Sequence, residues 1–293
     1  MKIKFLLMSM VAAMLVSCGT TSTVPITGRK QNLMVSDGEM LSLSTQQYQE
    51  FMKTAKLSTD ATKTAMVKSV GQNLANAVVS YLNANGMQND VQNYQWQFNL
   101  VADKQANAWC MPGGLIVVYE GLLPITQDEA SLAIVLGHEI AHAVARHSAE
   151  QMSQQMKQQY GVQGVSAVAS ILGVGSNTIS LGQAMASAGL NLANLKYSRN
   201  HESEADYMGL IFAAMAGYNP ESAVSFWQRM SSASTSTTAE FLSDHPSDAT
   251  RIKNIQGWLP EAKKYYKPKT TTTAKKTTTT KKKTTTKKTT TKK

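Results

Sequence analysis

A His-Glu-x-x-His motif inside an apolar segment constrains this chain more than any other feature. The motif runs from His138 through Glu139 to His142 and is surrounded by Leu, Ala, Ile and Val, which indicates a buried helix. Four residues advance an α-helix by about 400°, so the two histidines lie one turn apart on one face. Two such imidazoles can bind one zinc ion, and Glu139 is placed to take a proton from a metal-bound water. The motif therefore favours a zinc peptidase whose coordination sphere still lacks a ligand.

An acidic cluster sixty-four residues after His138 is the best source of the missing ligand. Its sequence is Glu202-Ser-Glu204-Ala-Asp206, and a catalytic zinc site needs three protein ligands. We expect Glu202 to bind the metal and Asp206, one turn later on the same side, to orient a ligand histidine. Glu204 points about 200° away from Glu202 and is expected to lie in solvent. The alternative is that the whole cluster is a charged helix face.

Several motifs in a fixed order give the chain a family resemblance. Through them it resembles the gluzincin zinc peptidases of the CaaX-prenyl-protease and HtpX type, particularly their soluble periplasmic lipoprotein branch. The resemblance covers roughly residues 24–258. It implies an α+β, predominantly helical, zincin-like domain with a small sheet whose edge strand borders the active-site cleft. The matching segments are Pro25-Ile-Thr-Gly28-Arg29, Asn107-Ala-Trp-Cys-Met-Pro-Gly-Gly114, Gly121-Leu-Leu, His138-Glu-Ile-Ala-His142, Glu202-Ser-Glu-Ala-Asp206, and His245-Pro246 followed by Arg251-Ile252.

The resemblance also implies roles for individual residues. One zinc ion per subunit would be bound by His138, His142 and Glu202, with Glu139 as general base. Asp206 matches the acidic residue one turn past the glutamate ligand. An edge made of Pro112, Gly113, Gly114, Leu115 and Ile116 would pair with an extended substrate through main-chain hydrogen bonds, which suits a peptidase of broad sequence preference.

Three further polar residues are more open. His245 either donates a hydrogen bond to the tetrahedral intermediate, or occupies the open coordination position and holds the enzyme latent, or is a structural histidine that caps the following helix. Arg251 either stabilises the same oxyanion or pairs with an acid. His147 lies about 140° around the helix from His142, so it is not expected to be a ligand.

The N-terminus is typical of an exported protein. Lys2 and Lys4 precede an apolar run that ends at Leu15-Val-Ser-Cys18, which predicts a signal peptide over 1–17 and lipidation of Cys18. An ordinary cleaved signal is the alternative. Lipid chains would anchor the protein to a bilayer surface. The sequence has no later apolar run of about twenty residues, so no membrane span is predicted. With Cys18 lipidated, Cys110 has no disulfide partner and is expected to be a buried apolar residue, with a reactive thiol as the alternative.

The positive net charge of +10 is concentrated at the C-terminus. Eleven lysines and no acids lie in 267–293, so the remainder is slightly acidic and nucleic-acid binding is not expected. A tail of Lys and Thr cannot bury apolar surface and is expected to be disordered. It either contacts envelope polyanions or only solubilises the protein.

The domain organisation expected from these patterns is a tether over 18–35, a peptidase domain over 36–260 and a tail over 261–293. Apolar spacing predicts helices over 36–56, 60–82, 197–216, 219–230 and 247–258. Alternation predicts strands over 94–102 and 115–119, and Thr126-Gln-Asp-Glu129 is a capping-box pattern for the motif helix. The segment 148–194 is either a lid beside the substrate or a plain helical hairpin.

We expect a zinc-dependent metalloendopeptidase of the bacterial cell envelope. Its expected substrates are misfolded or unassembled proteins on the periplasmic face of the outer membrane. In the mechanism, Glu139 takes a proton from water as it attacks a peptide carbonyl and returns it to the leaving amine. The alternative is an envelope chaperone or assembly factor with a latent or regulatory zinc site.

Overall fold

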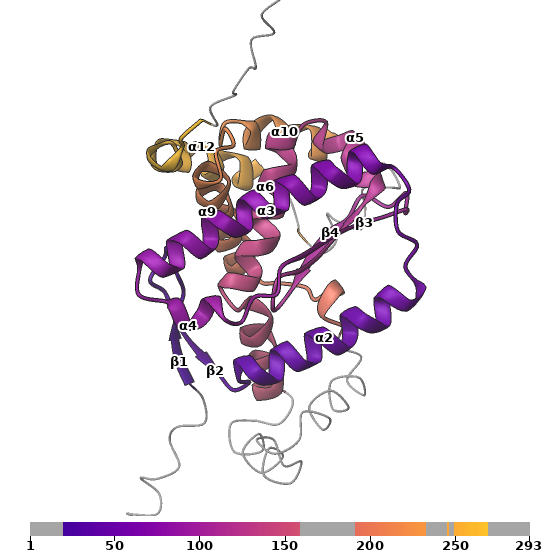
Figure 1. The fold of residues 1–293 in the computed structure, drawn as a ribbon. Helices are drawn as coiled ribbons and strands as arrows, with labels where there is room; N and C mark the ends of the chain where they lie inside the picture. Colours follow the sequence, from indigo (N-terminus) through magenta and orange to yellow (C-terminus); the bar gives the residue numbers. More distant parts are fainter. Residues whose placement is uncertain (1–19, 159–190, 233–244, 246–248, 269–293) are drawn as a thin grey trace, which may run out of the picture.

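The protein is described by a computed structural model that covers residues 20–158, 191–232, 245 and 249–268. The predicted signal peptide, Cys18, most of the segment 148–194 and nearly all of the Lys/Thr tail lie outside these residues. Within them the fold is mostly helical with small sheets (Figure 1), as expected. The long helices are α2 (Asp37–Thr54), α3 (Ala61–Ala84), α6 (Glu129–Val144), α9 (Arg199–Met215), α10 (Ser222–Ser232) and α12 (Ala249–Tyr265). The short elements are α4 (Gln88–Val91), η1 (Glu120–Leu122), α5 (Leu123–Thr126) and η2 (Leu192–Asn194).

The main sheet has three strands in the order β3-β5-β4. The strands are β3 (Gln97–Val101), β4 (Ala108–Met111) and β5 (Leu115–Tyr119). β5 pairs in parallel with β3 and antiparallel with β4. The prediction that strand 115–119 is the substrate-facing edge was therefore wrong, because both of its sides are paired. Among the described strands, β4 is the edge that packs along α6.

Both faces of this sheet are covered, which explains why β4 and β5 are apolar throughout. One face packs with α3 and α6 through residues such as Phe98, Cys110 and Ile116. The other face packs against α2 through Trp109, Val117 and others, and Figure 1 shows the sheet between α3 and α2. A four-residue strand that is buried on both faces shows no alternation of polar and apolar residues. For this reason β4 was not predicted from the sequence. Cys110 is buried as expected.

The N-terminal segment is part of the fold rather than a tether. Residues 20–33 form a hairpin of β1 (Thr20–Thr23) and β2 (Lys30–Leu33), and Val24 in its turn is 1% exposed. The tether predicted over 18–35 was wrong here because the turn and β2 pack against the helical body. The predicted domain end at 260 was also too early, since α12 continues to Tyr265 with Pro260 inside it.

Helix α6 is held against α9 at two glycines beside the motif. A Cβ on Gly209 would lie 2.6 Å from the backbone nitrogen of His138, and one on Gly137 would lie 2.7 Å from the carbonyl oxygen of Gly209. Real Cβ atoms do not approach this closely, so the two backbones touch where only glycine fits. This contact sets the distance between the helix of the histidine pair and the helix of Glu202.

Most helix starts match the sequence signals. Ser36 and Asp60 cap α2 and α3 with their side chains, at the starts of the predicted helices 36–56 and 60–82. The capping box predicted at Thr126 was wrong, because Thr126 ends α5 and Asp128 caps α6 by accepting from the Ser131 amide. Of the helices in the described ranges, none combines the length and apolar character that a membrane span requires.

Candidate metal centre

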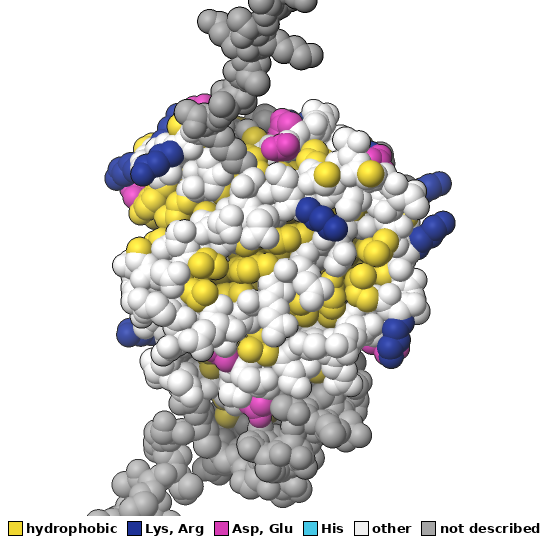
Figure 2. All heavy atoms as spheres, in the orientation of Figure 1, with side chains coloured by type: hydrophobic (Ala, Val, Ile, Leu, Met, Phe, Trp, Pro, Cys, Tyr) yellow, Lys and Arg dark blue, Asp and Glu magenta, His cyan; other side chains and the backbone are white. Residues whose placement is uncertain are grey.

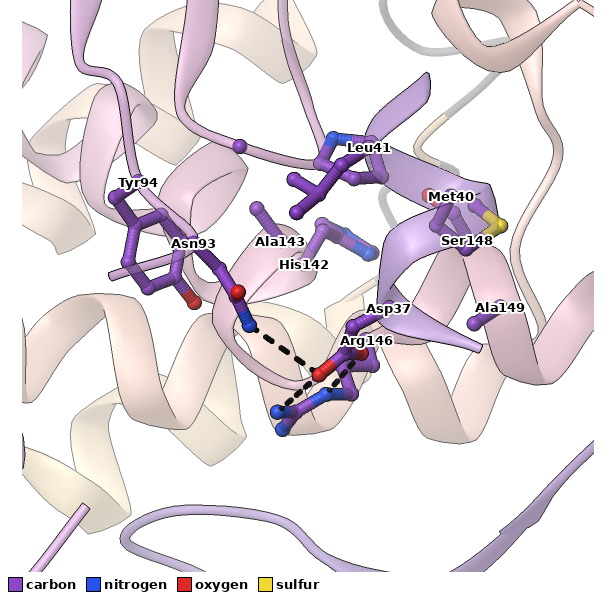
Figure 3. Close-up of a pocket in the computed structure, with 12 residues that line it drawn as sticks. Asp37, Met40, Leu41, Asn93, Tyr94, His142, Ala143, Arg146, Ser148 and Ala149 are labelled. Atoms are coloured by element: carbon purple, nitrogen blue, oxygen red, sulfur yellow. Dashed lines mark hydrogen bonds and ion pairs between the residues drawn. The ribbon is translucent and has the colours of Figure 1, made fainter. Parts of the chain in front are cut away.

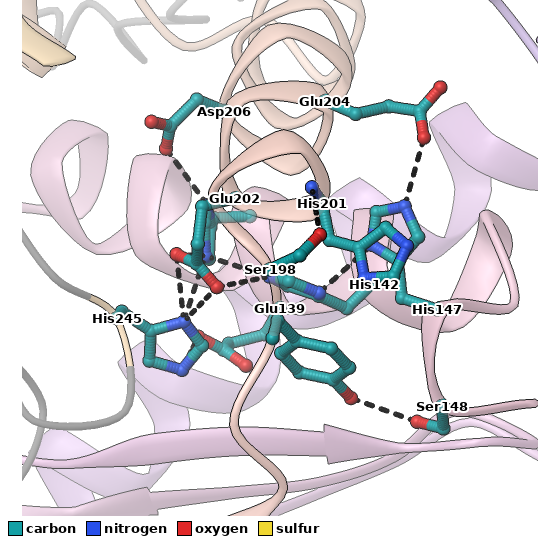
Figure 4. A network of polar contacts seen from close by, with 12 residues as sticks. Glu139, His142, His147, Ser148, Ser198, His201, Glu202, Glu204, Asp206 and His245 are labelled. Atoms are coloured by element: carbon teal, nitrogen blue, oxygen red, sulfur yellow. Dashed lines mark hydrogen bonds and ion pairs between the residues drawn. The ribbon is translucent and has the colours of Figure 1, made fainter. Parts of the chain in front are cut away.

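Four buried side chains point their donor atoms at one place. His138 and His142 from α6, Glu202 from α9 and His245 have ligand atoms that all lie within 4.8 Å of one another. Figure 4 shows His142, Glu202 and His245 of this set beside Glu139. The Nε2 atoms of His138 and His142 are 3.0 Å apart, and each lies 3.4 Å from a carboxylate oxygen of Glu202. His245 Nδ1 lies 3.2 Å from His138 Nε2 and 3.1 Å from Glu202 Oε1.

These separations fit a single zinc ion. Nitrogen and oxygen ligands at about 2.0–2.1 Å from a tetrahedral zinc lie about 3.3 Å from one another. The donor set of three imidazoles and one carboxylate has the chemistry that zinc prefers. The structure brings together His138, His142 and Glu202, the three ligands expected from the sequence. His245 joins them as a fourth donor, at the coordination position that one of its three alternatives gave it.

Glu139 lies beside the donor set, buried and weakly partnered. Glu139 is 3% exposed. Its Oε1 lies 3.5 Å from His245 Nε2 and accepts no hydrogen bond from any described residue. Burial raises the pKa of Glu139, although the nearby His245 and His138 oppose the rise. A carboxylate with a raised pKa and a spare acceptor is suited to proton transfer.

Asp206 holds His138 from behind. Its Oδ1 accepts from His138 Nδ1 at 2.9 Å, which leaves Nε2 of the same ring directed at the donor set. Burial opposes ionisation of Asp206, but the charge of Arg251 and the hydrogen bond from His138 outweigh it and lower its pKa. Arg251 from α12 donates to Asp206 Oδ1 at 2.6 Å, and its guanidinium carbon lies 3.5 Å from the centroid of the Trp227 ring. Of the two alternatives for Arg251, the contacts match pairing with an acid.

His142 is held by a different chain of contacts, which the sequence did not reveal. Its Nδ1 lies 3.0 Å from Nδ1 of His147, and His147 Nε2 lies 3.0 Å from Glu204 Oε2. The expectation that Glu204 lies in solvent was wrong, since it is 9% exposed. It also accepts from Thr27 Oγ1 at 2.5 Å and from Arg29 Nε at 2.8 Å.

The position of His147 depends on a break in the helix. Helix α6 ends at Val144, and Arg146 has φ +57°, so the chain turns and His147 does not follow the helical 140°. It is not among the four converging donors, as expected, but it contacts one of them. Burial lowers the pKa of His147 to about 4, despite the opposing hydrogen bond to Glu204. The position of His147 in the sequence, just past the motif, did not indicate its contact with His142.

The Tyr197 ring packs flat against the imidazole ring of His142. The two rings stack with centroids 4.0 Å apart, and the Tyr197 hydroxyl hydrogen-bonds with Ser148 Oγ at 2.8 Å (Figure 4). Burial raises the pKa of Tyr197, so the ring stays neutral. All five histidines of the chain are buried, and none is visible on the face drawn in Figure 2.

A pocket adjoins His142 on the side of α2. Met40, Leu41, Tyr94 and Pro112 are among the residues that line it. Figure 3 shows Arg146 and Asp37 paired at one side of it, with His142 among the side chains lining the space. The guanidinium of Arg146 donates to Asp37 at 2.8 and 2.9 Å. Pro112 and Gly113, predicted to face substrate, line this pocket.

Comparison with known proteins supplies the family. The model of Peptidase family M48 matches residues 61–259. The chain is 36% identical over 172 residues to the mitochondrial metalloendopeptidase OMA1 of Schizosaccharomyces pombe, covering 58% of this chain and 48% of that one. It is 25% identical over 261 residues to the metalloprotease LoiP of Escherichia coli, covering 87% and 96%. It is 28% identical over 183 residues to a putative beta-barrel assembly-enhancing protease of Vibrio cholerae, covering 61% and 37%.

The chain spans about half the length of the OMA1 relatives, whereas it spans nearly all of LoiP. The family match covers more than half of this chain and includes both motif helices. The buried donor set of His138, His142, Glu202 and His245 fits one zinc ion. By sequence and by site, this chain belongs to Peptidase family M48.

Proposed function

We propose that this protein is a zinc-dependent metalloendopeptidase. The observation that carries the proposal is the convergence of His138, His142 and Glu202 on one point, with Glu139 buried beside them. When bound there, zinc supplies Lewis-acid activation of water and of the peptide carbonyl. Glu139 accepts the proton of the attacking water and returns it to the leaving amine, for which its raised pKa is suited.

The substrate is proposed to bind along β4. The Tyr119 amide donates to the Asn107 carbonyl at 3.0 Å, so hydrogen-bond alternation in the β4–β5 pair directs the main-chain groups of Ala108 and Cys110 away from β5. An extended peptide adding to this edge would be held mainly by main-chain hydrogen bonds. Broad sequence preference follows, because every peptide offers those groups.

His245 is proposed to hold this form of the enzyme closed. Its Nδ1 lies among the donors, at 3.1–3.2 Å from Glu202 and His138, and so takes the position that a water or a substrate carbonyl needs. Catalysis would then require His245 to withdraw. Arg251, which is engaged with Asp206, would position the ligands rather than contact substrate.

The proposed setting is the bacterial cell envelope. The relatives LoiP and the putative beta-barrel assembly-enhancing protease come from bacteria, and the chain starts with a pattern typical of a signal peptide before Cys18. We propose lipid anchoring at Cys18 on the periplasmic face of the outer membrane, contact of the Lys/Thr tail with envelope polyanions, and misfolded or unassembled envelope proteins as substrates.

Replacing the general base tests the peptidase proposal. The Glu139→Gln variant should bind zinc like the wild type, because Glu139 is not a ligand, and should lose cleavage of unfolded casein by at least about 100-fold. Wild-type protein treated with a chelator is the matched control and should be equally inactive. Cleavage that persists in the variant or in chelator would contradict the mechanism.

A chaperone or assembly factor with a regulatory zinc site is the second candidate, favoured by the fourth donor at His245. Zinc-loaded wild-type protein that suppresses casein aggregation and never cleaves it would support that candidate.

A further inference from the structure

We propose that Thr27 and Arg29, in the turn of the N-terminal hairpin, are positioning residues for the zinc ligand His142 and act through Glu204 and His147. The inference rests on the proposed zinc site and goes beyond it, because it assigns a role in metal affinity to a segment more than a hundred residues earlier in the chain. Four side chains form the connection, and each link is a hydrogen bond or ion pair between buried or half-buried groups.

The protonation pattern of the connection is fixed by the metal ligand. A histidine that binds zinc through Nε2 carries its hydrogen on Nδ1. Nδ1 of His142 therefore donates to Nδ1 of His147 across 3.0 Å. His147 must then carry its own hydrogen on Nε2, and that atom lies 3.0 Å from the Glu204 carboxylate. Each donor meets one acceptor, so the orientation of the His142 ring depends on His147 and the tautomer of His147 depends on Glu204.

The hairpin turn holds Glu204 in the required place. Thr27 Oγ1 donates to Glu204 Oε1 at 2.5 Å, and Arg29 donates to Oε2 through Nε at 2.8 Å. The remaining guanidinium nitrogens of Arg29 bind Glu150 at 2.9 and 2.7 Å. Arg29 therefore bridges the chain segment after α6 to α9, and its removal would free the Glu204 carboxylate to leave His147.

The turn itself has a defined backbone shape. Gly28 has φ +69° and its amide donates to the Val24 carbonyl at 3.0 Å, while the Ile26 amide donates to the Tyr81 hydroxyl at 3.2 Å. These contacts present Thr27 and Arg29 together toward Glu204. Because docking of the turn favours the zinc-ready orientation of His142, zinc binding must favour docking of the turn to the same degree.

A set of single substitutions tests the connection through zinc affinity, measured by competition with a chromophoric chelator. His147→Leu removes the acceptor for His142, and we expect about a 10–100-fold loss of affinity. Glu204→Gln and Arg29→Gln should each lose several-fold, since they weaken the connection without removing that acceptor. Thr27→Val is the mildest variant and keeps the test open if a larger change prevents folding.

Gln31→Met is the matched control. Gln31 lies on β2 of the same hairpin and its side chain donates to the Ala145 carbonyl at 3.1 Å, and it makes no hydrogen bond with Glu204 or His147 in the described structure. The control should lower the thermal stability of the metal-free protein and leave zinc affinity unchanged. In the wild type, zinc should also slow amide hydrogen exchange in residues 24–34, and this protection should shrink in Arg29→Gln.

The outcomes separate this inference from the proposed function. Graded loss of zinc affinity in the connected variants, with none in Gln31→Met, supports it. Variants that lose stability but bind zinc like the wild type overturn it and leave the peptidase proposal intact. Wild-type protein that binds no zinc overturns both.

Discussion

At the scale of single residues, two histidines one turn apart in the same motif are held by different chemistry. His138 donates to the carboxylate of Asp206, whereas His142 contacts the neutral ring of His147. The Asp206 contact could be predicted, because Glu202 and Asp206 share one side of a helix. The contact of His147 could not, since it needs the turn at Arg146, and the burial of Glu204 needs a partner from residue 29.

Glu150 gives a prediction about acid stability. Burial opposes its ionisation, but hydrogen bonds from His201 and Arg29 outweigh burial and lower its pKa to about 2. The ionised form is thus favoured in the folded protein, and the resulting stability is complete above pH 4.5 and disappears as pH falls through about 2. Glu150→Gln should therefore be less stable than wild type by about 1 kcal/mol at pH 7.

Chemical denaturation of both proteins between pH 7 and pH 2 checks this expectation. The difference in unfolding free energy should shrink steadily below pH 4.5. A difference that stays constant across this range would show that Glu150 acts through packing rather than through its charge. Lys53→Gln, which removes an exposed ion pair, is a control that should change stability little at any of these pH values.

At the scale of elements, the long helices and the five-residue strands β3 and β5 could be predicted, whereas the four-residue strands could not. Ser36 and Asp60 cap helices with the expected apolar spacing, and periodicity over many residues gives a strong signal. β4 has four buried residues without alternation, and the hairpin strands have four residues each. Their pairing is decided by distant partners, so the edge was assigned to residues 112–116 instead of β4. The crossing of α6 and α9 likewise depends on a glycine pair that no local pattern marks.

Substitution at that crossing should damage the site through its supporting elements. Gly209→Ala places a Cβ 2.6 Å from the His138 backbone nitrogen, so the helices must move apart, and we expect a loss of about 3 kcal/mol in unfolding free energy. Separation of the helices also moves Glu202 from the histidine pair, so zinc affinity should fall. Thermal melting and chelator competition measure the two effects.

Gly257→Ala is the control, because it lies in α12 and its added Cβ meets no atom within 4 Å. Alanine is the better helix former, so this variant should be slightly more stable than wild type. Wild-type stability and zinc affinity in Gly209→Ala would mean that α6 and α9 do not need their close contact.

At the scale of the whole molecule, the site joins segments that are distant in the chain. α6 and α9 supply three donors, His245 supplies the fourth, and the turn at Thr27–Arg29 stands behind His142. The order of the motifs predicted which segments meet and left three roles open for His245, and the assembled fold places its ring among the donors. We propose that this closeness lets the His245 side chain decide whether the site is open or closed.

His245→Ala tests whether that side chain blocks the site. Removing the ring opens the position among the donors while His138, His142 and Glu202 stay in place, so casein cleavage should rise by about 10-fold over wild type. Zinc affinity should fall modestly, because three ligands remain. The measurement is the initial cleavage rate at saturating zinc, with Glu139→Gln/His245→Ala as the inactive control. A fall in rate with zinc still bound would instead assign His245 to stabilisation of the tetrahedral intermediate, and the closed form would not be a latent state.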